Sequence, residues 1–188
     1  YVAWQWKANG GTTASNTEGN TTTTVQANQD AGFSIVTYTG TGSSSQTMGH
    51  GLGVTPNIVL TKARSGTSNW SFNGNFGGMT YGTNRLLLNT TAALTADTNE
   101  VTAASSTTFT GGGSAGVNSN GATYVAYCFA DVQGYSKFGK YVGNASANGS
   151  FIYTGFQPAW VMIKGVDVAD DWYIFDNKRA GYNPEVFR

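Results

Sequence analysis

The sequence predicts an all-β protein, an antiparallel β-sandwich or jelly-roll-like domain that occurs in tandem repeat. The composition disfavours helices: Gly accounts for 26 of the 188 residues, and abundant Thr, Ser and Asn are poor helix formers. Aromatic residues, at 13%, supply enough apolar surface to offset the entropy of folding, which argues against disorder. Short apolar segments are separated by turns about every 8 to 12 residues, the spacing of sandwich domains. Several of these segments also recur at a fixed distance.

Three strands are predicted in the first part of the chain. YVAWQWKA (1–8) is a strand by its apolar and aromatic residues, and FSIVTYTG (33–40) alternates without a strongly polar face. NIVLTKA (57–63) is expected to be a strand that is buried on both faces. Pro56 stands at its start, where the missing backbone N–H disturbs the hydrogen bonds of a sheet least. TGSSSQTMGHGLG (41–53) is expected to be a turn-rich connection.

The middle of the chain continues the β pattern. NWSFNGN (69–75) carries Trp70 and Phe72 on one face. TNRLLLNT (83–90) fits either a strand or a short helix; we favour a strand, because polar β-branched residues follow it. TAALTAD (91–97) could form one helical turn.

Two strands close this part of the chain. They are STTFTGG (106–112) and TYVAYCFA (123–130), and Asn120-Gly121 is a turn signal before the second one. Cys128, the single cysteine, lies in the second strand. We expect it to behave as a small buried apolar residue.

The chain repeats part of itself. A shift of 102 residues places GVTPNIVLTKA (53–63) on GFQPAWVMIKG (155–165), and a shift of 123 residues places YVAW (1–4) on YVAY (124–127). Matches at the shift of 102 include Gly32 with Gly134, Gly53 with Gly155, Pro56 with Pro158, Lys62 with Lys164 and Trp70 with Trp172. Trp and Pro are not the abundant residues here, so biased composition does not explain these matches.

The repeat predicts a domain organisation. Residues 1–8 would be the last strand of a preceding repeat, 9–31 a polar linker or insertion, 32–130 one complete β repeat unit, and 131–188 the first half of the next repeat. On this interpretation we expect the chain to be a piece of a longer polypeptide.

Charge and reactive residues argue against several classes of function. Ten acidic residues balance ten basic ones, which does not favour a nucleic-acid partner, and no apolar run is long enough to insert into a membrane. His50, the single histidine, lies between glycines. We favour a turn residue there over a general base or metal ligand. No enzyme and no cofactor are therefore expected.

The acidic residues of DVADDWYIFDNKR (167–179) form the one carboxylate cluster of the chain. Asp167, Asp170 and Asp171 are weak candidates for a Ca²⁺ site, since carboxylates are calcium ligands. The spacing does not fit an EF-hand, and a solvated hairpin tip, paired with Lys178 and Arg179, explains the residues better. Nothing in the sequence places two carboxylates across a cleft, as a glycosidase requires.

Exposed aromatic rings beside Asn and Asp suit carbohydrate binding, because a ring stacks on the apolar face of a sugar while polar groups bond its hydroxyls. The candidates are Trp70, Trp172 and Tyr182. For each tryptophan, a structural role in the repeat competes with this interpretation and is favoured.

Several motifs resemble a repeat-domain family found in tail-fibre and virion structural proteins of marine, cyanophage-type phages. They are YVAYCFAxxxGYSKFGxYxGN (124–144), FIYTGFQPAWVMIK (151–164) and DNKRAGYNP (176–184), with GFSIVTYTGTG (32–42) and GHGLGVTP (49–56) upstream.

The resemblance implies a structural and adhesive component of a virion, a tail fibre or appendage on the virion surface. Implied partners are further copies in a homotrimer, other virion proteins and a glycan of the host surface. The alternatives are a carbohydrate-binding module of a larger enzyme and a secreted cellular adhesin. The resemblance carries over no catalytic residue.

Overall fold

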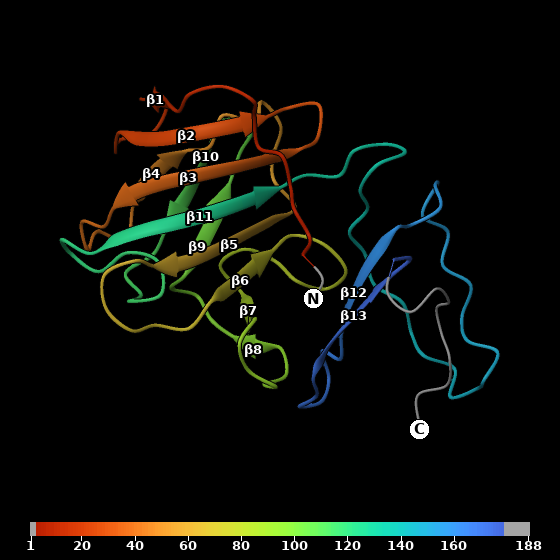
Figure 1. The fold of residues 1–188 in the computed structure, drawn as a ribbon. Coiled ribbons are helices and arrows are strands. Elements are labelled where there is room, and N and C mark those ends of the chain that lie inside the picture. The colour runs from red at the N-terminus through yellow and green to blue at the C-terminus, as the bar shows by residue number, and fades with distance from the viewer. Residues whose placement is uncertain (1–2, 179–188) are drawn as a thin grey trace.

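The computed structural model describes residues 3–178 and shows an all-β molecule (Figure 1). Eight strands form a large sheet in the order β1-β2-β3-β11-β5-β6-β7-β8, three form a second sheet in the order β4-β10-β9, and two form a separate hairpin. Neighbouring strands run antiparallel, and the described residues contain no helix. The predicted all-β antiparallel class is confirmed.

The strand bounds are as follows. The large sheet contains β1 (Ala14–Asn16), β2 (Thr23–Asn28), β3 (Phe33–Thr39), β5 (Ile58–Ala63), β6 (Ser71–Gly74), β7 (Asn84–Leu87), β8 (Thr95–Ala96) and β11 (Thr123–Phe129). The second sheet contains β4 (Gln46–Gly49), β9 (Val101–Ala104) and β10 (Thr108–Gly111), and the hairpin contains β12 (Trp160–Lys164) and β13 (Trp172–Asp176).

The main core lies between the two sheets. Strand β11 alternates strictly, so that Tyr124, Ala126 and Cys128 are fully buried while the residues between them are half-buried. Tyr38 of β3 stacks on Tyr124 with ring centroids 5.3 Å apart. From the opposite sheet, Phe109 of β10 meets Tyr38 at 5.9 Å. The strands predicted over 33–40, 57–63 and 123–130 are thus observed as β3, β5 and β11. Their apolar residues fill the core between the two sheets.

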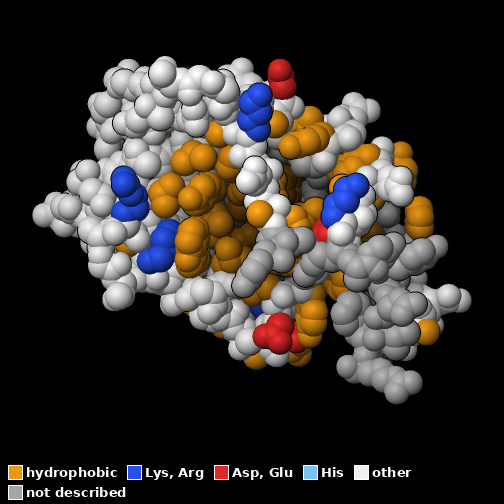
Figure 2. Space-filling model, viewed as in Figure 1, with side chains coloured by type: hydrophobic (Ala, Val, Ile, Leu, Met, Phe, Trp, Pro, Cys, Tyr) orange, Lys and Arg blue, Asp and Glu red, His pale blue; other side chains and the backbone are white. Residues whose placement is uncertain are grey.

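The opposite face of the large sheet carries a second apolar cluster. Ile58, Phe72 and Leu86 are buried there, and the β12–β13 hairpin adds Met162 and Trp172 against them. Figure 2 shows hydrophobic side chains gathered over the middle of the molecule on this face. The second cluster attaches the hairpin to the large sheet.

The segment 9–31, expected to be a linker or insertion, contains β1 and β2, which extend the large sheet beside β3. Two other predictions about the first half of the chain need correction. The connection expected over 41–53 contains strand β4, in which Met48 is fully buried. Conversely, residues 3–7, expected to lie in a strand, form none. Strands need a ladder partner, and a run of residues with strand character does not supply one.

The β12–β13 hairpin has the same register as the β5–β6 hairpin. Leu60 pairs with Phe72, and 102 residues further along the chain Met162 pairs with Ile174. The entry turns agree as well, because Gly53 and Gly155 have φ angles of 74° and 82°, in the left-handed region that favours glycine. The two hairpins are thus built alike.

Candidate functional site

The candidate site is an open groove of about 430 Å³ between the β7–β8 connection and the start of β13. Its lining residues are Leu88, Asn89, Thr90, Thr91, Asp171, Trp172 and Tyr173. The lining residues thus include two aromatic residues together with residues that carry hydroxyl, amide and carboxylate groups.

The first wall is a turn whose backbone is held by side chains. The N–H of Leu88 donates to the carbonyl of Trp70 over 3.0 Å, and the N–H of Trp70 donates to Asn89 Oδ1 over 2.9 Å. Asn89 Nδ2 donates to Asn69 Oδ1 over 3.0 Å. Because both ends of its amide are engaged, Asn89 orders the turn and positions the threonines that follow it.

The second wall is the start of β13, which is fastened to the first. Trp172 Nε1 donates to the carbonyl of Leu87 over 3.2 Å, and its ring lies 5.2 Å from the ring of Phe72. The N–H of Asp170 donates to the carbonyl of Thr91 over 2.8 Å. Hydrogen bonds and packing therefore join the two walls, so the groove is pre-formed.

The aromatic and acidic residues of the second wall interact with each other. The Tyr173 hydroxyl donates to Asp170 Oδ1 over 2.9 Å. This bond, together with the negative charges of Asp170 and Asp171, raises the pKa of Tyr173 above its ordinary value. The ring of Tyr173 is 45% exposed. The groove therefore offers a neutral, oriented phenol ring beside a carboxylate.

The structure separates the predicted sugar-binding residues. Trp172 lies in the groove. Trp70 lies outside the groove lining and stacks on Tyr127, with ring centroids 6.1 Å apart and planes inclined by 24°. Tyr182 lies outside the described residues. The shift of 102 residues aligns the two tryptophans, but their surroundings differ.

The weak metal candidates Asp167, Asp170 and Asp171 lie between β12 and β13, at the tip of the hairpin. Within residues 3–178, no three His, Cys, Asp or Glu side chains are grouped so as to hold a metal ion. Of the basic residues expected to pair with this cluster, Lys178 donates its backbone N–H to Asp176 Oδ1 over 2.9 Å. Arg179 lies outside the described residues.

Sequence reasoning missed the Asn89–Thr91 turn and Tyr173 as site residues. The run TNRLLLNT favours a strand over a short helix, and the structure shows that this strand, β7, ends at Leu87. The Asn-Thr-Thr sequence that follows is a turn signal that could have suggested an exposed loop. Nothing in the sequence indicates that this turn meets β13.

His50 and Cys128 are buried packing residues. The N–H of Leu52 donates to His50 Nδ1 over 3.1 Å, and His50 Nε2 lies 3.1 Å from the carbonyl oxygen of Ser105. Burial lowers the pKa of His50, and the contact with Ser105 opposes this in part. Burial raises the pKa of the Cys128 thiol to about 12, so the thiolate is not formed at neutral pH.

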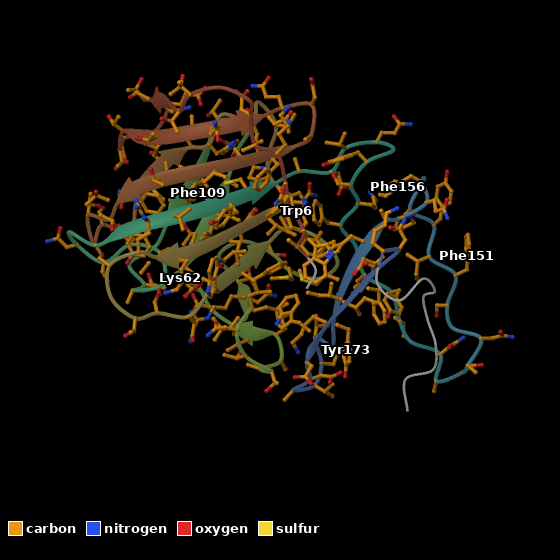
Figure 3. All side chains as sticks on the ribbon, in the orientation of Figure 1. Trp6, Lys62, Phe109, Phe151, Phe156 and Tyr173 are labelled. Carbon is orange, nitrogen blue, oxygen red and sulfur yellow. The ribbon has the colours of Figure 1, made fainter. Side chains whose placement is uncertain are left out.

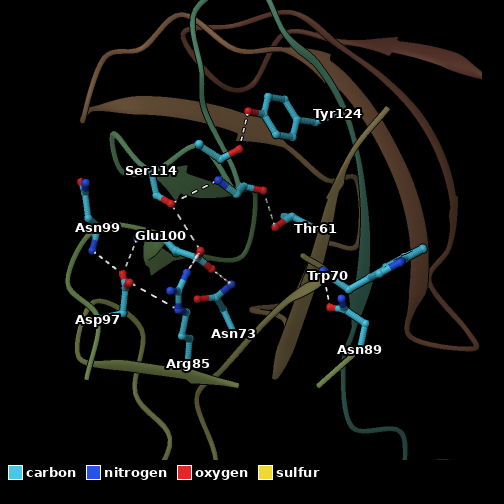
Figure 4. A network of polar contacts seen from close by, with 12 residues as sticks. Thr61, Trp70, Asn73, Arg85, Asn89, Asp97, Asn99, Glu100, Ser114 and Tyr124 are labelled. Carbon is cyan, nitrogen blue, oxygen red and sulfur yellow. Dashed lines mark hydrogen bonds and ion pairs between the residues drawn. The ribbon is translucent and has the colours of Figure 1, made fainter. Parts of the chain in front are cut away.

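A separate polar network lies between the sheets (Figure 4). Arg85 forms ion pairs with Glu100, which is buried, and with Asp97, at 3.4 Å from Nε to Oδ2. Ser114 Oγ also donates to Glu100 Oε1 over 3.3 Å. Because Arg85 pairs with the Glu100 carboxylate and that carboxylate is buried, this network is best explained as structural.

No helix among residues 3–178 is long and apolar enough to cross a membrane. The chain matches no curated protein and no solved structure. One family model, described as Domain of unknown function (DUF7483), matches residues 1–186, which is nearly the whole chain, and the chain therefore belongs to that family.

Proposed function

We propose that the protein is a structural and adhesive component of a virion, a fibre or appendage that attaches to glycans of the host surface through the Trp172 groove. The single observation that carries the glycan part is the groove lining, in which Trp172 and Tyr173 lie beside Asp171 and the Asn89–Thr91 turn. The virion part is supported by the motif resemblance of residues 124–144 and 151–164.

The chemistry of the groove suits a sugar. Aromatic rings bury the apolar C–H face of a pyranose, and polar groups at their edge bond its hydroxyls. The Asp171 carboxylate accepts hydrogen bonds, whereas the threonine hydroxyls of the turn both donate and accept them. An open groove lets a chain of sugars pass through, so we propose a polysaccharide or an extended glycan.

We further propose that the chain is built from tandem units of the sandwich or jelly-roll kind. The shared register of the β5–β6 and β12–β13 hairpins supports this proposal, as do the left-handed Gly53 and Gly155. Tandem units and a homotrimer would present many grooves to one surface. Weak individual sites then gain avidity without new contacts.

A glycan array tests the proposal directly. The chain, displayed as a trimer, is expected to bind a subset of host-surface polysaccharides, and Tyr173→Ala is expected to weaken that binding about tenfold or more. Tyr153→Ala is the matched control, because Tyr153 is also exposed, at 81%, but lies outside the groove lining. Equal binding by both variants, or binding to no glycan, would contradict the proposal.

The same groove fits a carbohydrate-binding module of a larger enzyme or a secreted adhesin. Incubation of the full parent protein with a bound polysaccharide separates the enzyme module from the fibre and the adhesin. A fibre leaves the chain length of the polysaccharide unchanged, whereas shortened chains would favour the enzyme.

A further inference from the structure

We propose that the binding surface of the Trp172 groove continues over Trp70 to Lys62, and that the polysaccharide bound there contains a uronic acid whose carboxylate pairs with Lys62. This extension rests on the glycan binding proposed for the groove, and it names the class of glycan. The class is a polymer that combines neutral sugars with acidic ones.

Trp70 lies directly beside the groove. Its backbone N–H donates to Asn89 Oδ1 over 2.9 Å, and its carbonyl accepts the N–H of Leu88 over 3.0 Å. Asn89 and Leu88 are both lining residues of the groove, and Figure 4 shows Trp70 joined to Asn89. A sugar chain that leaves the groove across Asn89 therefore meets Trp70 next.

The indole of Trp70 ends a row of stacked rings. It stacks on Tyr127, which stacks on Phe33 with ring centroids 6.4 Å apart and planes inclined by 6°. Tyr127 is on β11, so it approaches Trp70 from the β5 side of β6, whereas β7 and the groove turn lie on the other side. Trp70 is half-buried, and no second ring stacks on it within residues 3–178. A sugar ring can extend the row on the groove side, since its apolar face packs on indole.

Lys62 lies next to Trp70 on the same face of the large sheet. The β5–β6 register pairs Thr61 with Ser71, so the next residues along the two chains, Lys62 and Trp70, stand opposite each other. Thr61 and Ser71 are buried toward the main core, and alternation turns their neighbours to the other face. Figure 3 shows Lys62 on the large sheet and Tyr173 on the hairpin, with β6 and β7 between them.

The charge at this end of the surface is positive. Lys62 Nζ donates to the carbonyl of Ala63 over 3.2 Å and to Ser68 Oγ over 3.4 Å, and an ammonium group has more donors than these bonds use. Neither Lys62 nor the exposed Arg64 takes part in an ion pair of the described residues. Figure 2 shows Lys and Arg side chains at the left of this face, without Asp or Glu beside them. A carboxylate complements these cations, and its two oxygens match the planar fork of an arginine.

The charge at the groove end is negative. Asp171 lines the groove, and Asp170 accepts the hydrogen bond of the Tyr173 hydroxyl. These carboxylates repel an acidic sugar but accept hydrogen bonds from the hydroxyls of a neutral one. The opposite charges of the two ends therefore place a neutral sugar in the groove and the uronic acid at Lys62, which also fixes the direction of the chain.

Binding to a small panel of polysaccharides tests this assignment. Hyaluronan and glucuronoxylan combine neutral and uronic sugars, alginate contains uronic acids alone, and carrageenan carries sulfate without carboxylate. We expect the protein to bind hyaluronan or glucuronoxylan more tightly than alginate or carrageenan. Carboxyl reduction of the bound polymer, which converts its carboxylates to alcohols, is expected to weaken its binding about tenfold.

Variants locate the carboxylate on the surface. Lys62→Gln is expected to lower the affinity for the native polymer to that for the reduced one, whereas Lys62→Arg keeps the difference. Trp70→Leu is expected to weaken both forms alike, because stacking does not depend on the charge. The matched control is Lys140→Gln, since Lys140 is also exposed but lies beside Gly77; it should bind like the wild type. The unfolding free energy of each variant is measured in parallel.

The outcomes separate this extension from the groove itself. Equal affinity of the wild type for the native and carboxyl-reduced forms would overturn the extension without any variant, and so would tighter binding of carrageenan. An unchanged preference in Lys62→Gln would overturn it as well, and a loss of binding in Tyr173→Ala would then still support the groove. A preference that Lys62→Gln removes, with undiminished binding by Tyr173→Ala, would contradict the groove and the continuous surface. Binding to no polysaccharide would contradict both proposals.

Discussion

Arg85 is the residue on which the polar network between the sheets depends. It faces the buried carboxylate of Glu100 and the partly exposed carboxylate of Asp97. Replacing Arg85 by Ala would leave the Glu100 charge buried without its partner, and breaking a buried pair in this way costs about 3 to 5 kcal/mol of unfolding free energy. Urea unfolding of Arg85→Ala measures this loss.

The matched control is Arg64→Ala, because Arg64 is exposed and takes part in none of the ion pairs of the described residues. It is expected to change the unfolding free energy by less than about 0.5 kcal/mol. An Arg85→Ala variant as stable as this control would show that the network contributes nothing.

His50 makes stability depend on pH. Burial lowers its pKa in the folded state, so the unfolded chain binds a proton more readily than the folded one below the ordinary value of about 6.5. The unfolding free energy should therefore fall as the pH drops from 6.5 toward the lowered pKa, and this contribution should vanish above 6.5. Denaturant titrations of the wild type and of His50→Gln test this. An identical slope in both proteins would contradict the assignment.

The burial of His50 could not be predicted from the sequence. The glycines on both sides of it predict a turn, and a turn does not indicate whether the side chain is buried. Its burial depends on β4 pairing with β10, and β4 has one large apolar residue, Met48, among polar and small residues.

At the scale of the elements, the β12–β13 hairpin contacts the large sheet through Trp172. Trp172 packs on Phe72 and donates to the carbonyl of Leu87, but it is only half-buried. Trp172→Ala should cost about 2 to 3 kcal/mol, below the value for fully buried tryptophans. Trp172→Phe should lose about 1 kcal/mol, for the hydrogen bond alone.

Hydrogen exchange measures this docking element by element. In Trp172→Ala the amides of β12 and β13 should exchange faster while those of β11 stay protected. Tyr153→Ala, at an exposed residue outside the hairpin, serves as the control. Uniformly faster exchange in all strands would mean that the hairpin and the large sheet form one cooperative unit.

The strands that the sequence predicted well are those with a strong apolar period. β3, β5 and β11 each carry several large apolar or aromatic residues, because they fill the space between the sheets. β1, β2, β4 and β9 each have at most one large apolar residue. Their strand state depends on neighbouring strands rather than on their own residues, so a single sequence predicts them poorly.

At the scale of the whole molecule, the sequence match at a shift of 102 residues was more informative than the composition. It aligns Pro158 and Lys164 with Pro56 and Lys62, and β12–β13 pairs in the same register as β5–β6. It could not predict the groove, because the groove forms where the β7–β8 connection meets β13. These segments are far apart in the sequence, and their contact depends on the second apolar cluster. Trp172 was therefore a candidate from its residue type in the sequence. Asn89 and Tyr173 became candidates only because the structure places them in the groove lining.

The most direct test of the central claim is an equilibrium titration of the chain with a host-surface polysaccharide, comparing Tyr173→Ala with Tyr153→Ala. Binding through the groove predicts saturable binding by the wild type and by Tyr153→Ala, with a loss of about tenfold or more in affinity for Tyr173→Ala, equivalent to about 1.4 kcal/mol. The unfolding free energy of all three proteins should agree. Undiminished binding by Tyr173→Ala would contradict the claim that the Trp172 groove is the site of attachment.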